Sequence, residues 1–424
     1  MRGNIFKDYV RGLAAFVGGT LLLVIGINAL VNPFNLYAGL RLSGFNDYKY
    51  ELARHSRLSK AAELRRQRPE CLILGSSRAQ AGLDPDQPAW THCRVYNLAH
   101  AGGTLYESMR YFQQAAAIQR PREVVLALDL FMFNAYRPPQ PGFSEERLMV
   151  SIDGAPNPAW PRVFAYDVFS NLLSWDALKA SWKTAVPAHR RQRRGAEDGF
   201  WEYERFRLEQ APRRGQRDAF RRNEEAFLTT HWFPAPQRRF TTHDPVSGAD
   251  AYDSMRIILR IAHREGVRLH LLVSPAHARQ WETLRQAGLW QEFEDWKRML
   301  VHVNNEEARR AGRAPFSLWD FSGFNTYTTE DVPAESDRAG AMRWYWESSH
   351  FRKELGDIVL NRVLGQNATG HKVAVDFGVR LDARNLDAHL AGMRVAQLRW
   401  QQTHAQDVAE IAGIVRRTAA WRTP

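Results

Sequence analysis

The sequence predicts a mixed α/β fold: a parallel sheet of five strands flanked by helices, preceded by one membrane-spanning helix and followed by a helical C-terminal segment. Three observations support this prediction. Short apolar runs alternate with segments of helical periodicity. Residues 12–31 form an uncharged apolar run. With 424 residues, 44% of them hydrophobic, the chain can bury a large core, which argues against wholesale disorder.

The N-terminal apolar run predicts a retained single-pass anchor. Residues 12–31 match the length of about 20 residues that a helix needs to cross a bilayer. Residues 27–29 make a poor signal-peptidase site, so we expect an anchor rather than a cleaved signal. Arg2, Lys7 and Arg11 precede the run, although Arg41 follows it. The positive-inside rule therefore predicts a cytoplasmic segment 1–11, an inner-membrane location and a periplasmic or otherwise extracytoplasmic main domain.

The charge balance indicates an anionic partner. The formal net charge is +12 and the isoelectric point is near 9.9. An exported location argues against nucleic acid and favours envelope glycans or lipid headgroups. It also permits a disulfide between the two cysteines, Cys71 and Cys93, each of which lies near the start of a predicted strand. Two buried free thiols are the alternative.

The elements follow in order after a charged connector over residues 32–69. The α/β domain is predicted over residues 70–365, because apolar runs of strand length alternate there with helical patterns. The predicted strands cover residues 71–74, 94–98, 123–130, 267–273 and 316–321. The predicted helical segments cover residues 105–118, 252–264, 280–311 and 353–364. This alternation requires right-handed crossovers between parallel strands.

Two regions depart from the alternation. An insertion over about residues 134–250 is rich in arginine between Arg190 and Arg222, with Trp201, Tyr203 and Phe206 among the arginines. This stretch is either a solvated helical face with local acidic partners or a patch for an anionic polymer or lipid headgroups. Residues 366–424 have apolar residues at broadly helical spacing, which predicts an amphipathic appendage that packs on the core.

Two short motifs suggest a nucleophilic serine with its base and acid. Gly75-Ser76-Ser77-Arg78 directly follows the first strand, and Glu347-Ser-Ser-His350 lies far downstream. A hydroxyl at the carboxyl end of a parallel strand, beside a helix N-terminus, lies where α/β sheets bind ligands. A serine nucleophile needs an imidazole to accept its proton. The structural alternatives are a helix-capping role for Ser77 and a packed loop histidine for His350.

These motifs resemble the SGNH (GDSL-type) hydrolase superfamily, and more closely its membrane-anchored branch that includes alginate O-acetylation and lipoteichoic acid D-alanylation proteins. In that resemblance Ser77 is the nucleophile and Ser76 stands in the Asp position of the Gly-Asp-Ser block. Residues 97–103 resemble the glycine block, in which Gly102 or Gly103 helps to hold an oxyanion. The implied sheet is flavodoxin-like, in agreement with the strand count.

The resemblance departs from the family pattern in two blocks. Residues 129–134 replace the usual Gly-x-Asn-Asp, which leaves Asn134 as the candidate oxyanion donor. The fourth block is usually Asp-x-x-His, whereas this chain has Glu347 and His350. A glutamate can orient an imidazole as an aspartate does, but its extra methylene changes the geometry. Asp320, at the end of the fifth strand, is the alternative acid, or it caps the following turn.

Three side chains, Arg78, His277 and also Asp320, are candidates for substrate contacts. Arg78 either pairs with a carboxylate of the fold or holds an anionic substrate group. His277 follows the fourth strand, where it belongs to a substrate pocket or only to a turn. No Cys/His cluster has zinc spacing and no phosphate-binding glycine loop is present, so we expect neither a metal nor a cofactor.

The resemblance implies acyl transfer through an acyl-enzyme on Ser77, with His350 as base and backbone amides at Ser77 and Gly102 or Gly103 around the oxyanion. The expected function is O-acylation of an anionic or neutral envelope polysaccharide, beside a multi-spanning acyl-exporting membrane protein. An SGNH-type esterase or deacetylase is one alternative. The other is an inactive scaffold or glycan-binding protein, which the altered third and fourth blocks favour.

Overall fold

The computed structural model describes residues 2–49, 51–52, 55–186, 198–200, 215–244, 246–337, 340–366 and 373–419. The chain forms two compact units. The first comprises residues 1–68 and 142–197, and the second comprises residues 69–141 and 198–424. The insertion expected at 134–250 is therefore divided, since residues 142–197 belong with the N-terminal helix and its remaining residues belong with the sheet.

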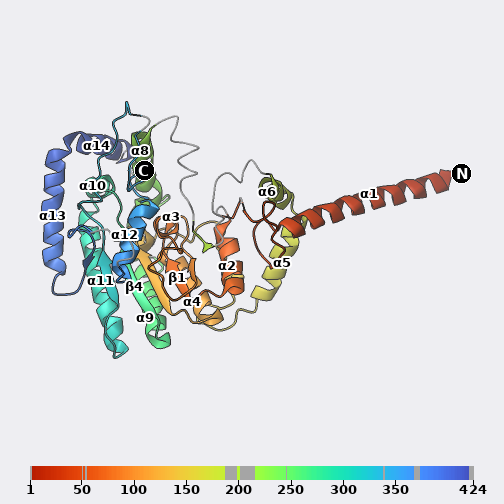
Figure 1. Ribbon diagram of the computed structural model, residues 1–424, viewed down its shortest axis with the longest axis horizontal. Coiled ribbons are helices and arrows are strands. Elements are labelled where there is room, and N and C mark those ends of the chain that lie inside the picture. The colour runs from red at the N-terminus through yellow and green to blue at the C-terminus, as the bar shows by residue number, and fades with distance from the viewer. Residues whose placement is uncertain are drawn as a thin grey trace. The chain divides into compact units, whose positions relative to one another are not determined.

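The second unit is built on a mostly parallel sheet of six strands in the order β2-β1-β3-β4-β5-β6 (Figure 1). Five of them match the predicted apolar runs and pair in parallel. They are β1 (Cys71–Leu74), β2 (Val95–Asn97), β3 (Glu123–Leu128), β4 (Arg268–Val273) and β5 (Ser317–Asp320).

The prediction of five strands is wrong by one strand, β6 (Val379–Arg380). It pairs antiparallel with β5 at Trp319 and Asp320. The strand is two residues long and neither of its side chains is fully buried. It lacks the apolar run by which the other strands can be identified, so the sequence carried no signal for it.

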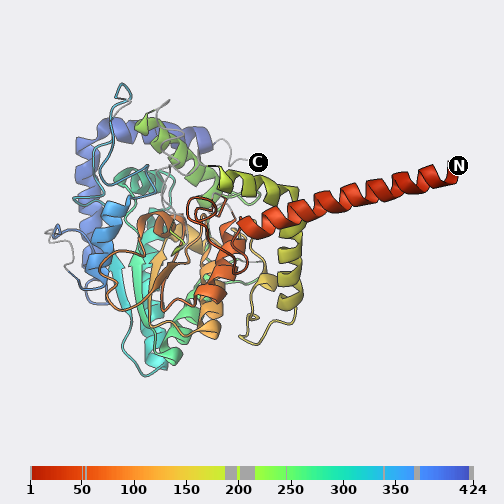
Figure 2. The ribbon, with the colours of Figure 1, turned by 45° about the vertical axis from the view of Figure 1, so that its right-hand side comes forward.

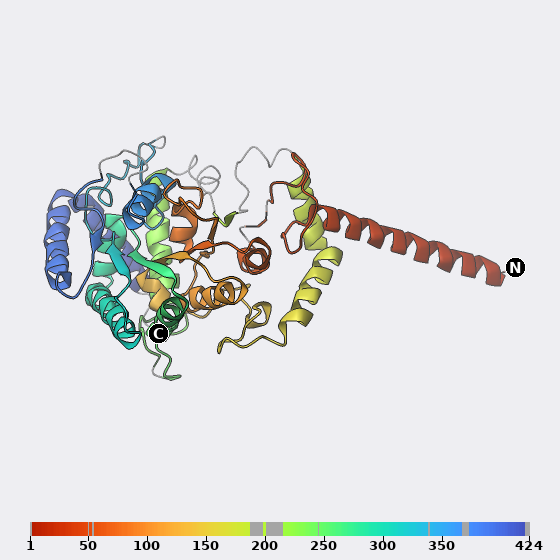
Figure 3. The same ribbon diagram turned by 60° about the horizontal axis from the view of Figure 1, so that its bottom comes forward.

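Helices cover both faces of the sheet (Figure 3). On one side α4 (Leu105–Ile118), α9 (Ala251–Glu265) and α11 (Trp290–Arg310) pack in succession. On the other side α12 (Lys353–Val363) packs on α3 (Ser77–Gly82). The side chains of β1 and the central strand β3 are almost entirely buried between these layers. Both strands therefore read as continuous apolar runs rather than as alternating ones.

The two cysteines form a disulfide, which links the chain just before β2 to the first residue of β1. Cys71 and Cys93 have a Cα–Cα distance of 5.9 Å. The bond follows from the strand order, since β1 and β2 are neighbours and Cys71 pairs in register with Val95. The sequence alone does not distinguish this disulfide from two buried free thiols, and the fold does.

The C-terminal helices α13 (Leu386–Thr403) and α14 (Ala405–Ala419) pack on the second unit. Trp400 and Ile411 bury their side chains against Ala278. Polar contacts converge on the fully buried Arg279 of α10 (Ala278–Gln286). Its guanidinium contacts Glu224 of α8 (Gln216–Ala226) at 2.8 Å and, on α14, Asp407 at 2.6 Å and Glu410 at 2.7 Å.

The remaining short elements of the second unit are η1 (Leu130–Phe133), which follows β3, and the π-helical turn η5 (Phe227–Trp232), which continues α8. In the first unit, α1 (Arg2–Val31) begins before the predicted run and contains a segment, Ile5–Val31, that is long and apolar enough to cross a membrane. The other elements are α2 (Ser56–Gln67), η2 (Glu145–Arg147), α5 (Trp160–Leu173) and α6 (Trp175–Ala185).

Replacing Arg279 by Met should destabilise the second unit, because Glu224 would then be left buried without a cation. Breaking a buried ion pair by removing one partner costs about 3–5 kcal/mol of unfolding free energy. Denaturant unfolding of the detergent-solubilised chain, followed by circular dichroism, measures the loss. The control is Arg384→Met, which removes an exposed pair with Asp382 and should leave the midpoint unchanged. Equal midpoints for Arg279→Met and wild type would contradict a stabilising role for this cluster.

Candidate active site

The turn after β1 leaves the hydroxyl of Ser77 partly accessible, although the residues around it are buried. Gly75 adopts φ +145°, and a Cβ there would lie 2.9 Å from the Ala127 carbonyl of β3, so only glycine fits. Ser76 caps α3 by accepting the Arg78 N–H at 3.2 Å. Ser77 is the first residue of α3 and is half-buried among fully buried neighbours. The capping role that was the alternative for Ser77 thus belongs to Ser76, and the Ser77 hydroxyl is left for other contacts.

The structure brings Ser77, His350 and Glu347 together. The Ser77 Oγ lies 2.8 Å from His350 Nε2, and His350 Nδ1 is hydrogen-bonded to the Glu347 carboxylate. Glu347 is 1% exposed and also accepts the backbone N–H groups of Ser349 and His350, each at 2.9 Å. Because the carboxylate accepts at Nδ1, the network assigns the imidazole proton to Nδ1, and Nε2 is the acceptor of the Ser77 hydroxyl.

We call the hydrogen-bonded series Ser77, His350 and Glu347 the relay. A buried ion pair between Arg78 and Asp129 fixes its serine loop relative to its histidine loop. Arg78 donates from Nη1 to Asp129 at 2.7 Å and from Nε to Ser349 Oγ at 2.9 Å. The second oxygen of Asp129 accepts the Ser76 hydroxyl at 2.6 Å. Both charged side chains are almost completely buried. Of the two expectations for Arg78, the structure thus shows the pairing with a carboxylate of the fold.

The loop that carries His350 is anchored on two further segments. The Tyr345 hydroxyl donates to the Pro275 carbonyl at 2.9 Å, and the His277 N–H donates to the Ser348 carbonyl at 3.0 Å. Gln216 of α8 donates to the Tyr345 carbonyl at 2.9 Å. The second part of the insertion therefore supports the loop that carries His350.

Two backbone amides near the serine remain available. The Gly103 N–H donates to the His100 carbonyl at 2.9 Å, and the His100 N–H donates to the Gly75 carbonyl at 3.1 Å, which ties this turn to the serine loop. Within the described residues, neither the Ser77 N–H nor the Gly102 N–H has a hydrogen-bond acceptor. Gly102, with φ +61°, is therefore a better candidate oxyanion donor than Gly103.

Asn134 is placed for a different task from the predicted one. Its Nδ2 donates to the carbonyls of His231 at 3.2 Å and Trp232 at 3.1 Å, and its Oδ1 accepts the Tyr136 N–H at 3.2 Å. The amide thus holds the end of η5. As placed, it has no N–H directed to an oxyanion at Ser77.

His231 is a neighbour of the relay that the sequence did not indicate. Its ring packs between Phe131 and Phe227, with centroid distances of 4.9 Å and 4.4 Å. Burial, together with the nearby charges of Arg137, Arg78 and His350, lowers the pKa of His231 well below its usual range. A neutral imidazole therefore lies beside the triad. A lone histidine inside an irregular insertion belongs to no motif, so sequence reasoning had no signal for it.

Asp320 is not the acid of the relay. Its carboxylate contacts Lys297 Nζ at 2.6 Å and His389 Nε2 at 2.8 Å, and it is buried. Although burial opposes ionisation, these two partners lower the pKa of Asp320 below its usual range. Glu347 occupies the position on His350 for which Asp320 was the alternative. Asp320 instead caps the following turn, the other expectation for it, by accepting the Ser322 N–H at 2.9 Å.

His277 caps a helix instead of lining a pocket. Its Nδ1 accepts the Arg279 N–H at 3.1 Å and its Nε2 donates to the Glu330 carbonyl at 2.7 Å. The ring is 1% exposed, and burial lowers its pKa to about 3.

The described part of the Arg-rich stretch is paired with acidic side chains. Arg217 contacts Asp407 at 2.9 Å and Glu410 at 2.7 Å, and Arg221 contacts Glu335 at 2.8 Å. Arg222 pairs with Asp218 on its own helix. Arg190, Arg191, Arg193, Arg194, Arg213 and Arg214, with Trp201, Tyr203 and Phe206, lie outside the described residues.

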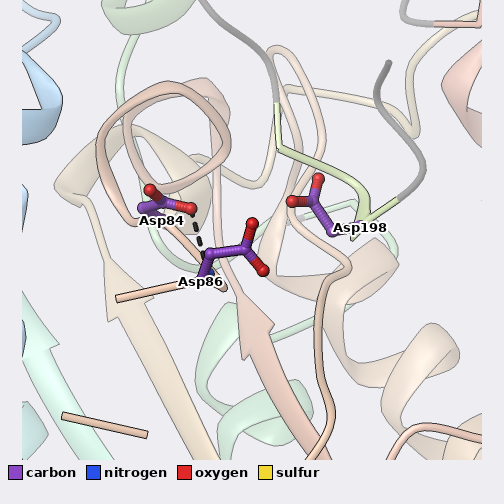
Figure 4. A group of neighbouring side chains, drawn as sticks. All are labelled: Asp84, Asp86 and Asp198. Carbon is purple, nitrogen blue, oxygen red and sulfur yellow. Dashed lines mark hydrogen bonds between the residues drawn. The ribbon is translucent and has the colours of Figure 1, made fainter. Parts of the chain in front are cut away.

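One group of carboxylates lies close enough together to share a cation (Figure 4). It consists of Asp84, Asp86 and Asp198, whose ligand atoms lie within 4.8 Å of one another. Lys353 Nζ lies 3.1 Å from the Asp84 carboxylate and already offsets part of this charge. Acidic clusters are common without an ion, and we assign no metal site here.

In comparisons with known proteins, no family model and no curated protein matches this chain. The chemical interpretation therefore depends on the geometry of the site. A hydroxyl, an imidazole and a carboxylate in series, beside free backbone N–H groups, form an arrangement suited to nucleophilic acyl transfer.

Replacing Asp129 by Asn should change the position of Ser77 relative to His350, although Asp129 contacts neither side chain of this pair directly. The guanidinium of Arg78 would then be buried without its carboxylate, and the serine loop would shift against the histidine loop. Misplacement by about 1 Å can slow a reaction by about 100-fold. The rate of fluorophosphonate labelling of Ser77 measures this loss. The control is Asp86→Asn, which changes an exposed carboxylate and should label at the wild-type rate. Equal rates for the two variants would contradict the positioning role.

His277 should make stability depend on pH. The folded pKa lies below the value of about 6.5 for a free imidazole, so below pH 6.5 only the unfolded chain binds this proton. Stability therefore falls on acidification, by about 2 kcal/mol between pH 7 and pH 5. In His277→Asn a non-titrating side chain keeps the capping acceptor. Its unfolding free energy should fall by about 2 kcal/mol less over this interval. Urea titrations at pH 7 and pH 5 measure the unfolding free energy of both proteins. An equal loss for wild type and for His277→Asn would refute the lowered pKa of His277.

Proposed function

We propose that this protein is a membrane-anchored serine acyltransferase of the SGNH type, which transfers an O-acetyl or related acyl group to a cell-envelope or secreted polysaccharide. The observation that carries the proposal is the continuous relay from the Ser77 hydroxyl through His350 to the buried Glu347 carboxylate. A helix-capping serine would not need this relay. The capping bond comes from Ser76 instead.

The sheet supports the superfamily assignment. Its first five strands have the order 2-1-3-4-5, which is that of flavodoxin-like folds. In such sheets ligands bind outside the carboxyl ends of the strands, where the strand order reverses between β1 and β3. Ser77 follows β1 and Asp129 follows β3, so the relay lies at this position.

The proposed reaction has two halves. Ser77 Oγ attacks an acyl carbonyl while His350 Nε2 accepts its proton, and Glu347 stabilises the resulting imidazolium. The N–H groups of Ser77 and Gly102 hold the oxyanion. The intermediate expels the leaving group, which takes the proton from His350, and an acyl ester on Ser77 remains. A sugar hydroxyl then gives its proton to His350 and attacks this ester. When the bond between the acyl group and Ser77 Oγ breaks, His350 returns the proton to Ser77.

The first unit supports a retained anchor. Asn28, near the end of α1, is completely buried and bonds to Leu172, Ser174 and Ser181. Cleavage after residue 29 would remove this buried residue from the unit. We infer, from Arg2, Lys7 and Arg11, that the N-terminus is cytoplasmic and that the chain after α1 lies in the periplasm, where the Cys71–Cys93 disulfide is stable.

The anchor and the basic charge favour transfer to an envelope polymer over hydrolysis of a soluble ester. A multi-spanning membrane protein that exports acyl groups is the partner that such a reaction requires, since acyl donors are made in the cytoplasm. An esterase or deacetylase would use the same site with water as the acceptor. An inactive scaffold would not need the Glu347–His350 bond.

Mass spectrometry of the full chain in detergent, after incubation with an activated acetyl ester, tests the proposal. We expect one acetyl group on Ser77. Ser77→Ala should remove the adduct, and His350→Ala and Glu347→Gln should slow its formation, the latter by up to about 10⁴-fold as for other triad acids. The matched control is Ser247→Ala, which changes an exposed serine and should acylate normally.

The outcomes separate the alternatives. Loss of the adduct only when polysaccharide fragments are added, with the acetyl group recovered on the fragments, supports a transferase. Rapid loss to water alone indicates an esterase. No adduct on the folded wild-type chain refutes catalysis and favours a scaffold.

A further inference from the structure

The helices α5 and α6 of the first unit expose aromatic and apolar side chains along one face each. On α5 the exposed residues Tyr166, Phe169 and Leu173 recur at intervals of three and four, which places them on one side of the helix. On α6, Trp175 and Trp182 are 65% and 71% exposed. We call these five residues the aromatic face. Soluble helices place such residues inward, so large exposed apolar side chains on two consecutive helices indicate a binding surface.

The side of α6 opposite its tryptophans is packed. Ala177, Ala180 and Ser181 are buried there, and Ala177 and Ala180 join Phe34 and Leu36 in one apolar cluster. On α5 the buried residue is Asn171, which lies on the side of the helix away from Phe169. On α6 the aromatic face is therefore the outer side of a helix whose inner side is filled, and on α5 it lies opposite the buried position.

The aromatic face begins where α1 enters the unit. Asn28 donates to the Leu172 carbonyl at 3.0 Å and to the Ser174 carbonyl at 3.3 Å, and it accepts the Ser181 hydroxyl at 2.9 Å. These contacts lie at the junction of α5 and α6, beside Leu173 and Trp175. Figure 2 shows α5 running crosswise to α1 at this point. A bilayer crossed by α1 would therefore have its surface next to the aromatic face.

We propose that the aromatic face lies on the lipid surface of the membrane from which α1 emerges, so that α5 and α6 form an interfacial platform. Tyr and Trp are enriched at this depth, where an apolar ring and a polar edge are both satisfied. The exposed Arg162 and Lys179 lie along the same two helix faces and can reach lipid phosphates. The inference requires α1 to cross a membrane, but it does not depend on acyl transfer.

Spin labels in the full-length chain test the platform. The native cysteines are both in the disulfide, so without reductant only an introduced thiol reacts. Labels are placed at Phe169→Cys and Trp182→Cys, and the protein is reconstituted in phosphatidylcholine–phosphatidylglycerol nanodiscs that contain no other protein. Power-saturation measurements with oxygen and an aqueous nickel chelate give the depth of each label. Circular dichroism checks that each variant is folded.

Two labelled controls complete the design. Leu398→Cys on α13 has a comparable exposed apolar side chain, 58% exposed, but belongs to the other unit, and its label should collide freely with the nickel chelate. Leu22→Cys on α1, 70% exposed, should lie in the hydrocarbon core.

We expect the labels at positions 169 and 182 to lose collisions with the nickel chelate and to lie about 5–10 Å below the lipid phosphates. Nickel accessibility equal to that of the Leu398 label overturns the proposal. So does a water-exposed label at position 22, because α1 would not be inserted. Labels that are accessible in nanodiscs but protected in native membranes also overturn it, and they would indicate a membrane-protein partner instead.

Discussion

The candidate site depends on one buried ion pair, between Arg78 and Asp129. It joins three segments that are far apart in the sequence: the serine loop after β1, the end of β3 and the histidine loop, which Arg78 reaches through Ser349. Neither charge can be removed alone without leaving the other buried and unpaired. The Ser77–His350 contact of 2.8 Å is therefore set by residues that have no part in the proposed reaction.

Other buried ion pairs between distant segments lie along the carboxyl edge of the sheet. Arg279, after β4, is buried against Glu224 and the α14 carboxylates, and Lys297 is buried against Asp320 at the end of β5. In each case a cation after or beside one strand meets carboxylates from other segments. These two clusters attach helices to the core, whereas the Arg78 cluster orients Ser77, the proposed nucleophile. In the proposed reaction, similar buried pairs thus serve packing in two places and positioning in the third.

Sequence reasoning was strongest where a local signal exists. The apolar runs identify β1 and β3 because both faces of these strands are buried, and the Gly75-Ser76-Ser77 and Glu347-to-His350 motifs identify the residues of the relay. It failed where the signal is spatial. β6 is too short to carry a pattern, Asn134 is used for the turn at His231, and Asp320 is taken by Lys297. Asp129 stands directly after an apolar strand, but only the fold shows that it pairs with Arg78.

The bonds of Asn28 have a consequence for the order of assembly. The partners of Asn28 lie 143 to 153 residues further along the chain, beyond the first three strands of the sheet. Translation and export deliver the chain from its N-terminus onward, so α1 leaves the ribosome long before the residues that enclose its end. The first unit therefore cannot finish folding before the first three strands of the second unit have been synthesised.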